Sequence, residues 1–295
     1  MIYFLIGLSL VISAFFSYLL IPHIGVIARR KKLFDLPAGA TLARHASPRL
    51  GGVVFVPVVF FSLAFAVGIW YTYGAYIAQP LAYAFVPEFC LFVCGLTLLY
   101  IYGIKEDLIG SRLRSKLLVQ LLAASFLPLA GLWINNLYGL GGIGRIPAWA
   151  GIPLTLFAVV AITGAIELTD TSGGIASGVG SAALAVSGAL FLHERLFIYA
   201  LLSFVTLGAL LPLFCYTISG KSAPRGKTGM GSAGRLSLGY ILSFLFIRYA
   251  VCEPELSASA EGCTVMLSAW MIPAAVCYLP AVEKASRRHK KIKKQ

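Results

Sequence analysis

Four acidic residues have the types and spacing for chemistry on phosphate groups. Glu106 and Asp107 are adjacent, and Glu167 and Asp170 lie three residues apart, which places both on one face of a helix if the helix continues that far. Two acidic pairs that face one pocket can hold a divalent cation and, through it, a diphosphate. In the alternative interpretation, each acid pairs with a nearby lysine or arginine, or ends its helix in water.

Two glycine-rich segments, 171–178 and 226–235, lie near these acids on the same predicted face. Glycine lets backbone N–H groups approach phosphate oxygens closely, and the N-terminus of a following helix favours anions. Lys227 and Arg235 in the second segment add positive charge for phosphate. Glycine is also common where membrane helices pack closely, so each segment has a purely structural alternative.

The elements that must position these residues are apolar stretches long enough to cross a bilayer, which takes roughly 20 residues each. Only 12% of the 295 residues are charged, and 59% are hydrophobic. We therefore predict an all-α integral membrane protein, a polytopic bundle of about nine transmembrane helices. A single transmembrane domain covers 1–281, and a basic tail covers 282–295. The predicted spans are 1–28, 50–70, 85–104, 117–134, 151–169, 175–192, 197–219, 236–252 and 263–281.

The positions of lysine and arginine predict the orientation. Of the 24 such residues, 21 lie in the tail and in alternate gaps between spans, namely 29–49, 105–116 and 220–235. Because basic residues stay on the cytoplasmic side, the N-terminus is expected outside and the C-terminus in the cytoplasm. The net charge of +13 then reflects attraction to anionic membrane lipids, and no nucleic acid is expected as a partner. Arg248 falls near the outer end of its span, where its long side chain can reach the interface.

Four groups of motifs resemble one family in order and spacing, over essentially the whole chain. They are LFDLP at 33–37 with HASPRLGG at 45–52, GIKEDL at 103–108 with RSKLLVQ at 114–120, ELTDTSGGIASG at 167–178, and MGSAGRLSLG at 230–239. The family is that of the bacterial polyprenyl-phosphate N-acetylhexosamine-1-phosphate transferases. The resemblance implies transfer of a sugar-1-phosphate from a UDP-N-acetylhexosamine to undecaprenyl phosphate, with Mg²⁺ as cofactor. This reaction starts the lipid intermediates of cell-envelope polysaccharides.

The same resemblance implies the site residues. Catalytic roles are expected for Glu106, Asp107, Glu167 and Asp170, with Asp107 and Asp170 binding the metal. Contacts to the substrate phosphates are expected from His45, Arg49, Lys116, Lys227, Gly231 and Ser232. His45 and Arg49 have the alternative role of anchoring their loop to lipid headgroups.

Undecaprenyl phosphate, a UDP-sugar and membrane lipids are the partners that the resemblance implies, and a homodimer is left open. The expected location is the bacterial inner (plasma) membrane, crossed several times, with the active face in the cytoplasm.

The chain departs from the family's pattern at polar positions. Glu106 stands for an aspartate, Glu167 for an asparagine, Gly173 for a second aspartate, and Ser232 for the family's metal-binding aspartate. A His-x-His motif is represented only by His289. Two hypotheses follow. The chain is an active transferase in which Glu106 and Glu167 serve as substitute ligands, or it is a catalytically silent relative. A silent relative would bind a polyprenyl phosphate or nucleotide-sugar without turnover, or would partner an active enzyme.

Overall fold

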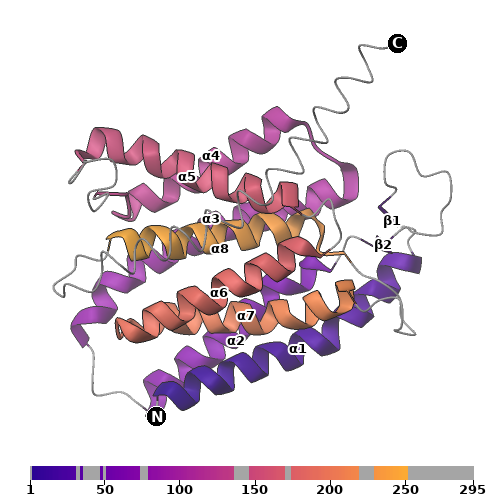
Figure 1. The fold of residues 1–295 in the computed structure, drawn as a ribbon, viewed down its shortest axis with the longest axis horizontal. Helices are drawn as coiled ribbons and strands as arrows, with labels where there is room; N and C mark the ends of the chain where they lie inside the picture. The colour runs from indigo at the N-terminus through magenta and orange to yellow at the C-terminus, as the bar shows by residue number, and fades with distance from the viewer. Residues whose placement is uncertain are drawn as a thin grey trace.

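The chain folds into a bundle of long helices (Figure 1). The computed structural model describes residues 2–30, 34–35, 47–48, 51–73, 79–135, 146–169, 174–218 and 229–251. The helices in these ranges are α1 (Ile2–Arg30), α2 (Gly52–Tyr73), α3 (Gln79–Ile109), α4 (Leu113–Leu129), α5 (Ala148–Thr169), α6 (Ile175–His193), α7 (Phe197–Ile218) and α8 (Gly231–Val251). The other regular structure described is one antiparallel pair of two-residue strands, β1 (Phe34–Asp35) and β2 (Ser47–Pro48).

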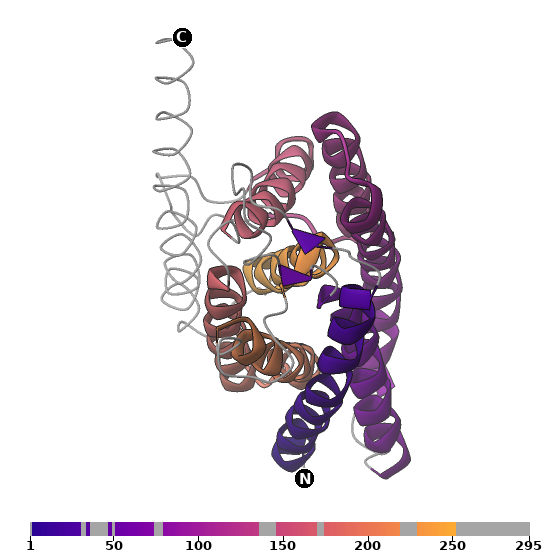
Figure 2. The same cartoon turned by 90° about the vertical axis from the view of Figure 1, so that its right-hand side faces the viewer.

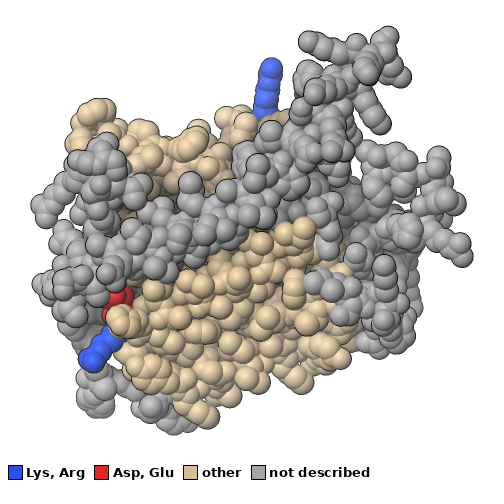
Figure 3. All heavy atoms as spheres, in the orientation of Figure 1, with Lys and Arg blue, Asp and Glu red and all other residues tan. Residues whose placement is uncertain are grey.

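The prediction of an all-helical membrane protein is confirmed. Seven of the described helices are long and apolar enough to cross a membrane, all except α4. Large apolar side chains face outward on several of them, including Phe4, Ile101 and Trp149, which are 74%, 66% and 80% exposed. Figure 3 shows a broad face on which the described residues carry charge only near the edges. Lipid can cover such a face, since it satisfies apolar side chains.

Three helices differ from the predicted spans, and the first is α3, which runs from Gln79 to Ile109 and extends beyond both ends of the predicted span 85–104. The helix predicted over 117–134 is α4, which has 17 residues and ends at Leu129. Gly131 there has φ +82°, and the N–H of Leu132 donates back to the carbonyl of Leu127, so the chain turns instead of continuing as a helix. Helix α8 begins at Gly231, five residues before the predicted start at 236. The ninth predicted span, 263–281, and the basic tail lie outside the described residues, and the total of nine and the orientation stay predictions.

Helix α8 runs through the middle of the bundle, as the end-on view in Figure 2 shows. It packs against α2, α3, α5 and α6, while α1 packs on α7 and α2 at one side. In the apolar stretch of α8, 78% of the residues are buried inside the bundle, against 33% in that of α1. Phe244 of α8 stacks on Phe92 of α3 with ring centroids 4.3 Å apart. A helix surrounded in this way brings its two ends into contact with several neighbours at once.

One end of the bundle collects the polar residues of interest and is called the acidic end here. It is formed by the start of α2, the end of α3, the start of α4, the end of α5 and the start of α8. The backbone N–H of Gly51 donates to the carbonyl of Gly229 at 3.1 Å, which ties the start of α2 to the start of α8. The charge pattern predicts that this end faces the cytoplasm.

At the opposite end, three polar side chains tie α3, α7 and α8 together. The Tyr199 hydroxyl donates to Glu88 Oε2 at 2.7 Å. Arg248 Nε lies 3.7 Å from the same oxygen, and the guanidinium lies over the Tyr199 ring, 4.9 Å from its centroid. Arg248 was predicted as a residue that reaches the membrane interface. Its side chain is only 22% exposed, because Glu88 gives it a partner inside the bundle.

We expect Glu88→Gln to lower the free energy of unfolding by about 1–2 kcal/mol, because Arg248 would lose its counter-ion in a partly buried place. Thermal unfolding in detergent micelles measures the effect. Glu194→Gln is the control, since its carboxylate lies at the same end near His193, a side chain that is 75% exposed. Equal melting temperatures for the two variants would show that the Glu88 tie contributes nothing.

Candidate functional site

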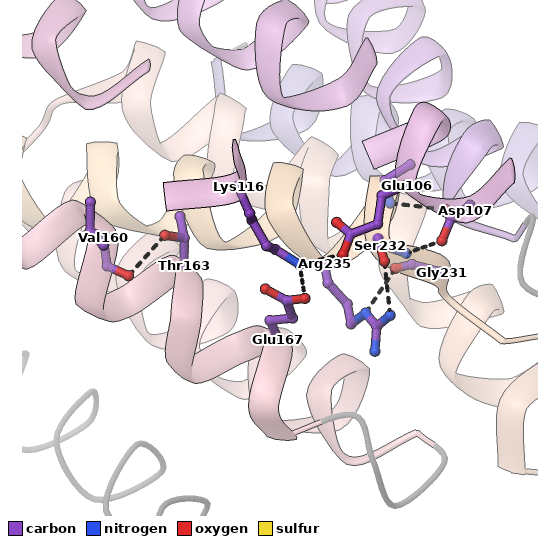
Figure 4. Close-up of polar contacts among 10 residues, drawn as sticks. Glu106, Asp107, Lys116, Val160, Thr163, Glu167, Gly231, Ser232 and Arg235 are labelled. Carbon is purple, nitrogen blue, oxygen red and sulfur yellow. Dashed lines mark hydrogen bonds and ion pairs between the residues drawn. The ribbon is translucent and has the colours of Figure 1, made fainter. Parts of the chain in front are cut away.

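A buried lysine lies between two glutamates at the acidic end (Figure 4). Lys116 Nζ donates to Glu106 Oε1 at 2.8 Å and also contacts Glu167 Oε1. The three side chains come from α4, α3 and α5, and they are 6%, 16% and 23% exposed. The structure therefore brings together residues that are 10 and 51 positions apart in the chain.

The electrostatics of this triad follow from its burial. Burial lowers the pKa of the Lys116 ammonium from its ordinary value, and the hydrogen bond and charge of Glu106 oppose that change. With two carboxylates in contact, the charged form of Lys116 is the one that the geometry supports. Glu106 Oε2 is buried and has no hydrogen-bond partner among the described residues.

Asp107, the neighbour of Glu106, makes different contacts. Its Oδ1 accepts the backbone N–H of Ser232 at 2.7 Å, and its Oδ2 accepts that of Ala233 at 3.1 Å. These N–H groups belong to the first turn of α8, where no intrahelical partner exists and where the helix dipole favours a negative charge. Gly231 has φ +68°, which allows the chain to turn sharply into the helix. Asp107 thus caps α8 from another helix.

The start of α8 also holds Ser232 and, one turn after Gly231, Arg235. Arg235 Nε donates to the carbonyl of Gly231 at 3.0 Å, and Nη2 donates to Ser232 Oγ at 3.2 Å. Its positive charge lies close enough to Asp107 and Lys116 to act on both. The family that the motifs resemble has a metal-binding aspartate at the position of Ser232. In this chain the position carries a buried hydroxyl, which accepts a hydrogen bond from the Arg235 guanidinium.

Gly103 explains how α3 and α8 come so close at this point. A Cβ on Gly103 would overlap the backbone of Ala233, with Ala233 N only 2.7 Å away. The absence of a side chain lets Asp107, one helical turn further on, reach the N-terminus of α8.

Six of the ten predicted site residues lie in the described part of the chain and gather at the acidic end. They are Glu106, Asp107, Lys116, Glu167, Gly231 and Ser232. The other four, His45, Arg49, Asp170 and Lys227, lie outside the described residues. Arg235 was predicted only as one of several bases near phosphate. Arg235 lies four residues after Gly231, a spacing of about one helical turn. This spacing indicates a place at the site only if a helix begins at Gly231.

The middle and C-terminal half of the chain match the sequence pattern of a known protein family. The pattern of "Glycosyl transferase family 4" matches residues 89–250, which is more than half of the chain and spans the helices that build the site. The chain belongs to glycosyl transferase family 4. The resemblance seen in the motifs is thereby confirmed.

Curated proteins with similar sequences are named as transferases of undecaprenyl phosphate, of decaprenyl phosphate or of phospho-N-acetylmuramoyl-pentapeptide. A probable undecaprenyl-phosphate N-acetylglucosaminyl 1-phosphate transferase of Bacillus subtilis (strain 168) is 26% identical over 249 residues, covering 81% of this chain and 62% of the relative. A phospho-N-acetylmuramoyl-pentapeptide-transferase of Enterococcus hirae is 25% identical over 221 residues, covering 69% and 62%. A decaprenyl-phosphate N-acetylglucosaminephosphotransferase of Mycobacterium leprae (strain TN) is 26% identical over 297 residues, covering 95% and 69%. The chain thus spans less than two thirds of the length of the first two of these glycosyl transferase family 4 members.

The family resemblance implies a magnesium ion, and the ligands that this ion needs can be compared with the side chains at the acidic end. Mg²⁺ requires a nearly octahedral set of oxygen ligands. Within the described ranges, no group of three or more His, Cys, Asp or Glu side chains is placed to hold a metal ion. Both oxygens of Asp107 accept N–H groups, and Glu106 and Glu167 each give one oxygen to Lys116. The described side chains of this glycosyl transferase family 4 member therefore do not fit a magnesium site in this arrangement.

Proposed function

We propose that this chain binds a polyprenyl phosphate at the acidic end of the bundle, on the cytoplasmic face of the membrane, and does not carry the magnesium-assisted transfer of a sugar-1-phosphate. The observation that carries the proposal is the engagement of Asp107. Each oxygen of Asp107 already accepts a backbone N–H of α8, so a metal ion would have to share this carboxylate with the helix cap. Ser232 supplies no second carboxylate at that helix start.

The corner between α3 and α4 supports the binding of a lipid that ends in phosphate. Ile109 and Leu113 are 81% and 80% exposed, and they alternate with the exposed bases Lys105 and Arg112. Apolar side chains beside basic ones suit a site at the membrane surface, where the apolar part contacts the lipid tail and the bases attract the headgroup. The undecaprenyl-phosphate and decaprenyl-phosphate named for the relatives have this chemistry.

A second candidate function is favoured by one observation on Glu106. Its Oε2 is buried without a hydrogen-bond partner in the described part of the chain, and Glu167 lies beside it. These two carboxylates are the substitute ligands of a remodelled transferase, which would use a UDP-N-acetylhexosamine and undecaprenyl phosphate. This candidate requires Lys116 to leave its place between them.

Release of UMP distinguishes the two functions. The purified chain in detergent micelles is given undecaprenyl phosphate, Mg²⁺ and a panel of UDP-N-acetylhexosamines. We expect no release above that of a protein-free control. Magnesium-dependent release that Glu106→Gln abolishes would overturn the proposal and establish the remodelled transferase.

Lipid binding tests the positive half of the proposal. We expect undecaprenyl phosphate to bind more tightly than undecaprenol, which lacks the phosphate, in a fluorescence titration. The double variant Lys105→Gln/Arg112→Gln is expected to weaken binding about 10- to 30-fold, at about 1 kcal/mol for each base near the surface. Arg195→Gln, an exposed base at the opposite end, is the matched control. Equal affinity for the two lipids would contradict the proposal.

A further inference from the structure

The triad of Lys116, Glu106 and Glu167 contains its own counter-ion. Three helices each contribute one side chain, and the ammonium contacts an oxygen of each carboxylate (Figure 4). Lys116 as a residue is only 5% exposed. Two carboxylates brought together in a poorly hydrated place repel each other, unless one of them keeps its proton or a cation lies between them. In this chain a side chain supplies that cation.

The surroundings of the triad add a second positive charge. The guanidinium of Arg235 is directed by its bonds to the Gly231 carbonyl and Ser232 Oγ, and its charge acts on Lys116. A divalent cation that approached Glu106 and Glu167 would meet an ammonium and a guanidinium. Its attraction to the carboxylates would be offset by repulsion from these two groups.

We propose that the Lys116 ammonium is the resident cation of this site and that it excludes divalent cations by occupying the position between Glu106 and Glu167. This inference rests on the proposed function, in which the site binds a lipid phosphate without magnesium. It gives the physical reason why the site does not bind that ion. It assigns Lys116 to the carboxylates, as in the alternative interpretation of the acidic residues, whereas the family resemblance implies a contact with substrate phosphate.

Binding of Mn²⁺ to the full chain in detergent micelles tests the inference without reference to transfer. Free Mn²⁺ is followed by its electron paramagnetic resonance signal, which is lost when the ion binds to protein. We expect the wild type to take up no Mn²⁺ in the micromolar range. Lys116→Met is expected to create one binding site per chain, with affinity at least tenfold above the wild type. The double variant Lys116→Met/Glu106→Gln is expected to lose that site.

Two matched variants show whether the charge of Lys116 is responsible. Lys116→Arg keeps a cation in place and is expected to behave as the wild type does. Arg114→Met removes an exposed base two residues earlier on α4 and is also expected to leave Mn²⁺ binding unchanged. A site that appears in Arg114→Met to the same degree as in Lys116→Met would overturn the inference.

The wild type by itself also decides the question, even if Lys116→Met does not fold. Micromolar Mn²⁺ binding to the wild type that Glu106→Gln removes would overturn the inference. The outcome is separate from that of the UMP experiment. UMP release without Mn²⁺ binding would contradict the proposed function but would still support Lys116 as the resident cation.

Discussion

Asp107→Ala is expected to lower the free energy of unfolding by about 2–4 kcal/mol. Two buried backbone N–H groups at the start of α8 would lose a charged acceptor, and a hydrogen bond to a charged group contributes about 1.5–3 kcal/mol. The two bonds share one carboxylate, so their contributions are not additive. The helix would also lose the favourable interaction of a negative charge with its N-terminal dipole.

Chemical unfolding of the purified chain in detergent micelles, followed by circular dichroism, measures this loss. Asp107→Asn keeps one acceptor oxygen, so its loss should be about half that of Asp107→Ala. Glu194→Ala at the opposite end is the control, because its carboxylate accepts no backbone N–H in the described structure and lies near an exposed histidine. A loss for Asp107→Ala no larger than that of Glu194→Ala would show that α8 needs no cap from α3.

Gly103→Val is expected to destabilise the bundle by about 1–3 kcal/mol or more, because its Cβ would overlap the backbone of Ala233. Backbone atoms cannot rotate away as a flexible side chain can, so α3 and α8 must separate. The separation would also lengthen the two hydrogen bonds from α8 to Asp107. The melting temperature in micelles measures the total effect.

Gly68→Ala in α2 is the matched control for this helix contact. A Cβ there meets no atom within 4 Å, so only helix propensity changes, and alanine is favoured over glycine by about 1 kcal/mol. We therefore expect changes of opposite sign in the two variants. Stabilisation by Gly103→Val would show that α3 and α8 do not approach each other as described.

The charge balance at the acidic end connects these results to function. Glu106, Asp107 and Glu167 are opposed by Lys116 and Arg235, so the acids at this end are largely committed to contacts within the protein. In the resembling family, a metal ion and substrate phosphates are expected to share such a site. In this chain Lys116 and Arg235 place positive charge at the site, and under the proposed function the exposed bases at the corner of α3 and α4 attract a lipid headgroup.

The sequence by itself determined the class of this protein and most of its helices. Long apolar runs are local properties of the chain, so α1, α2, α5, α6 and α7 begin and end within a few residues of the predicted spans. The family motifs are also local, and the residues around 106, 167 and 232 that they single out lie at one end of the bundle. The alternation of basic segments predicts which face the site occupies.

Only the tertiary structure decided what each polar side chain does. Glu106 and Asp107 are adjacent in sequence, but the first contacts Lys116 and the second caps a helix 125 residues away. The same contact places the start of α8 at Gly231, because N–H groups that receive an acceptor from α3 can form a helical turn where the local sequence reads as a glycine loop. Such pairings depend on distances between helices, and those distances are set by packing contacts such as Gly103 against Ala233, which local sequence patterns do not contain.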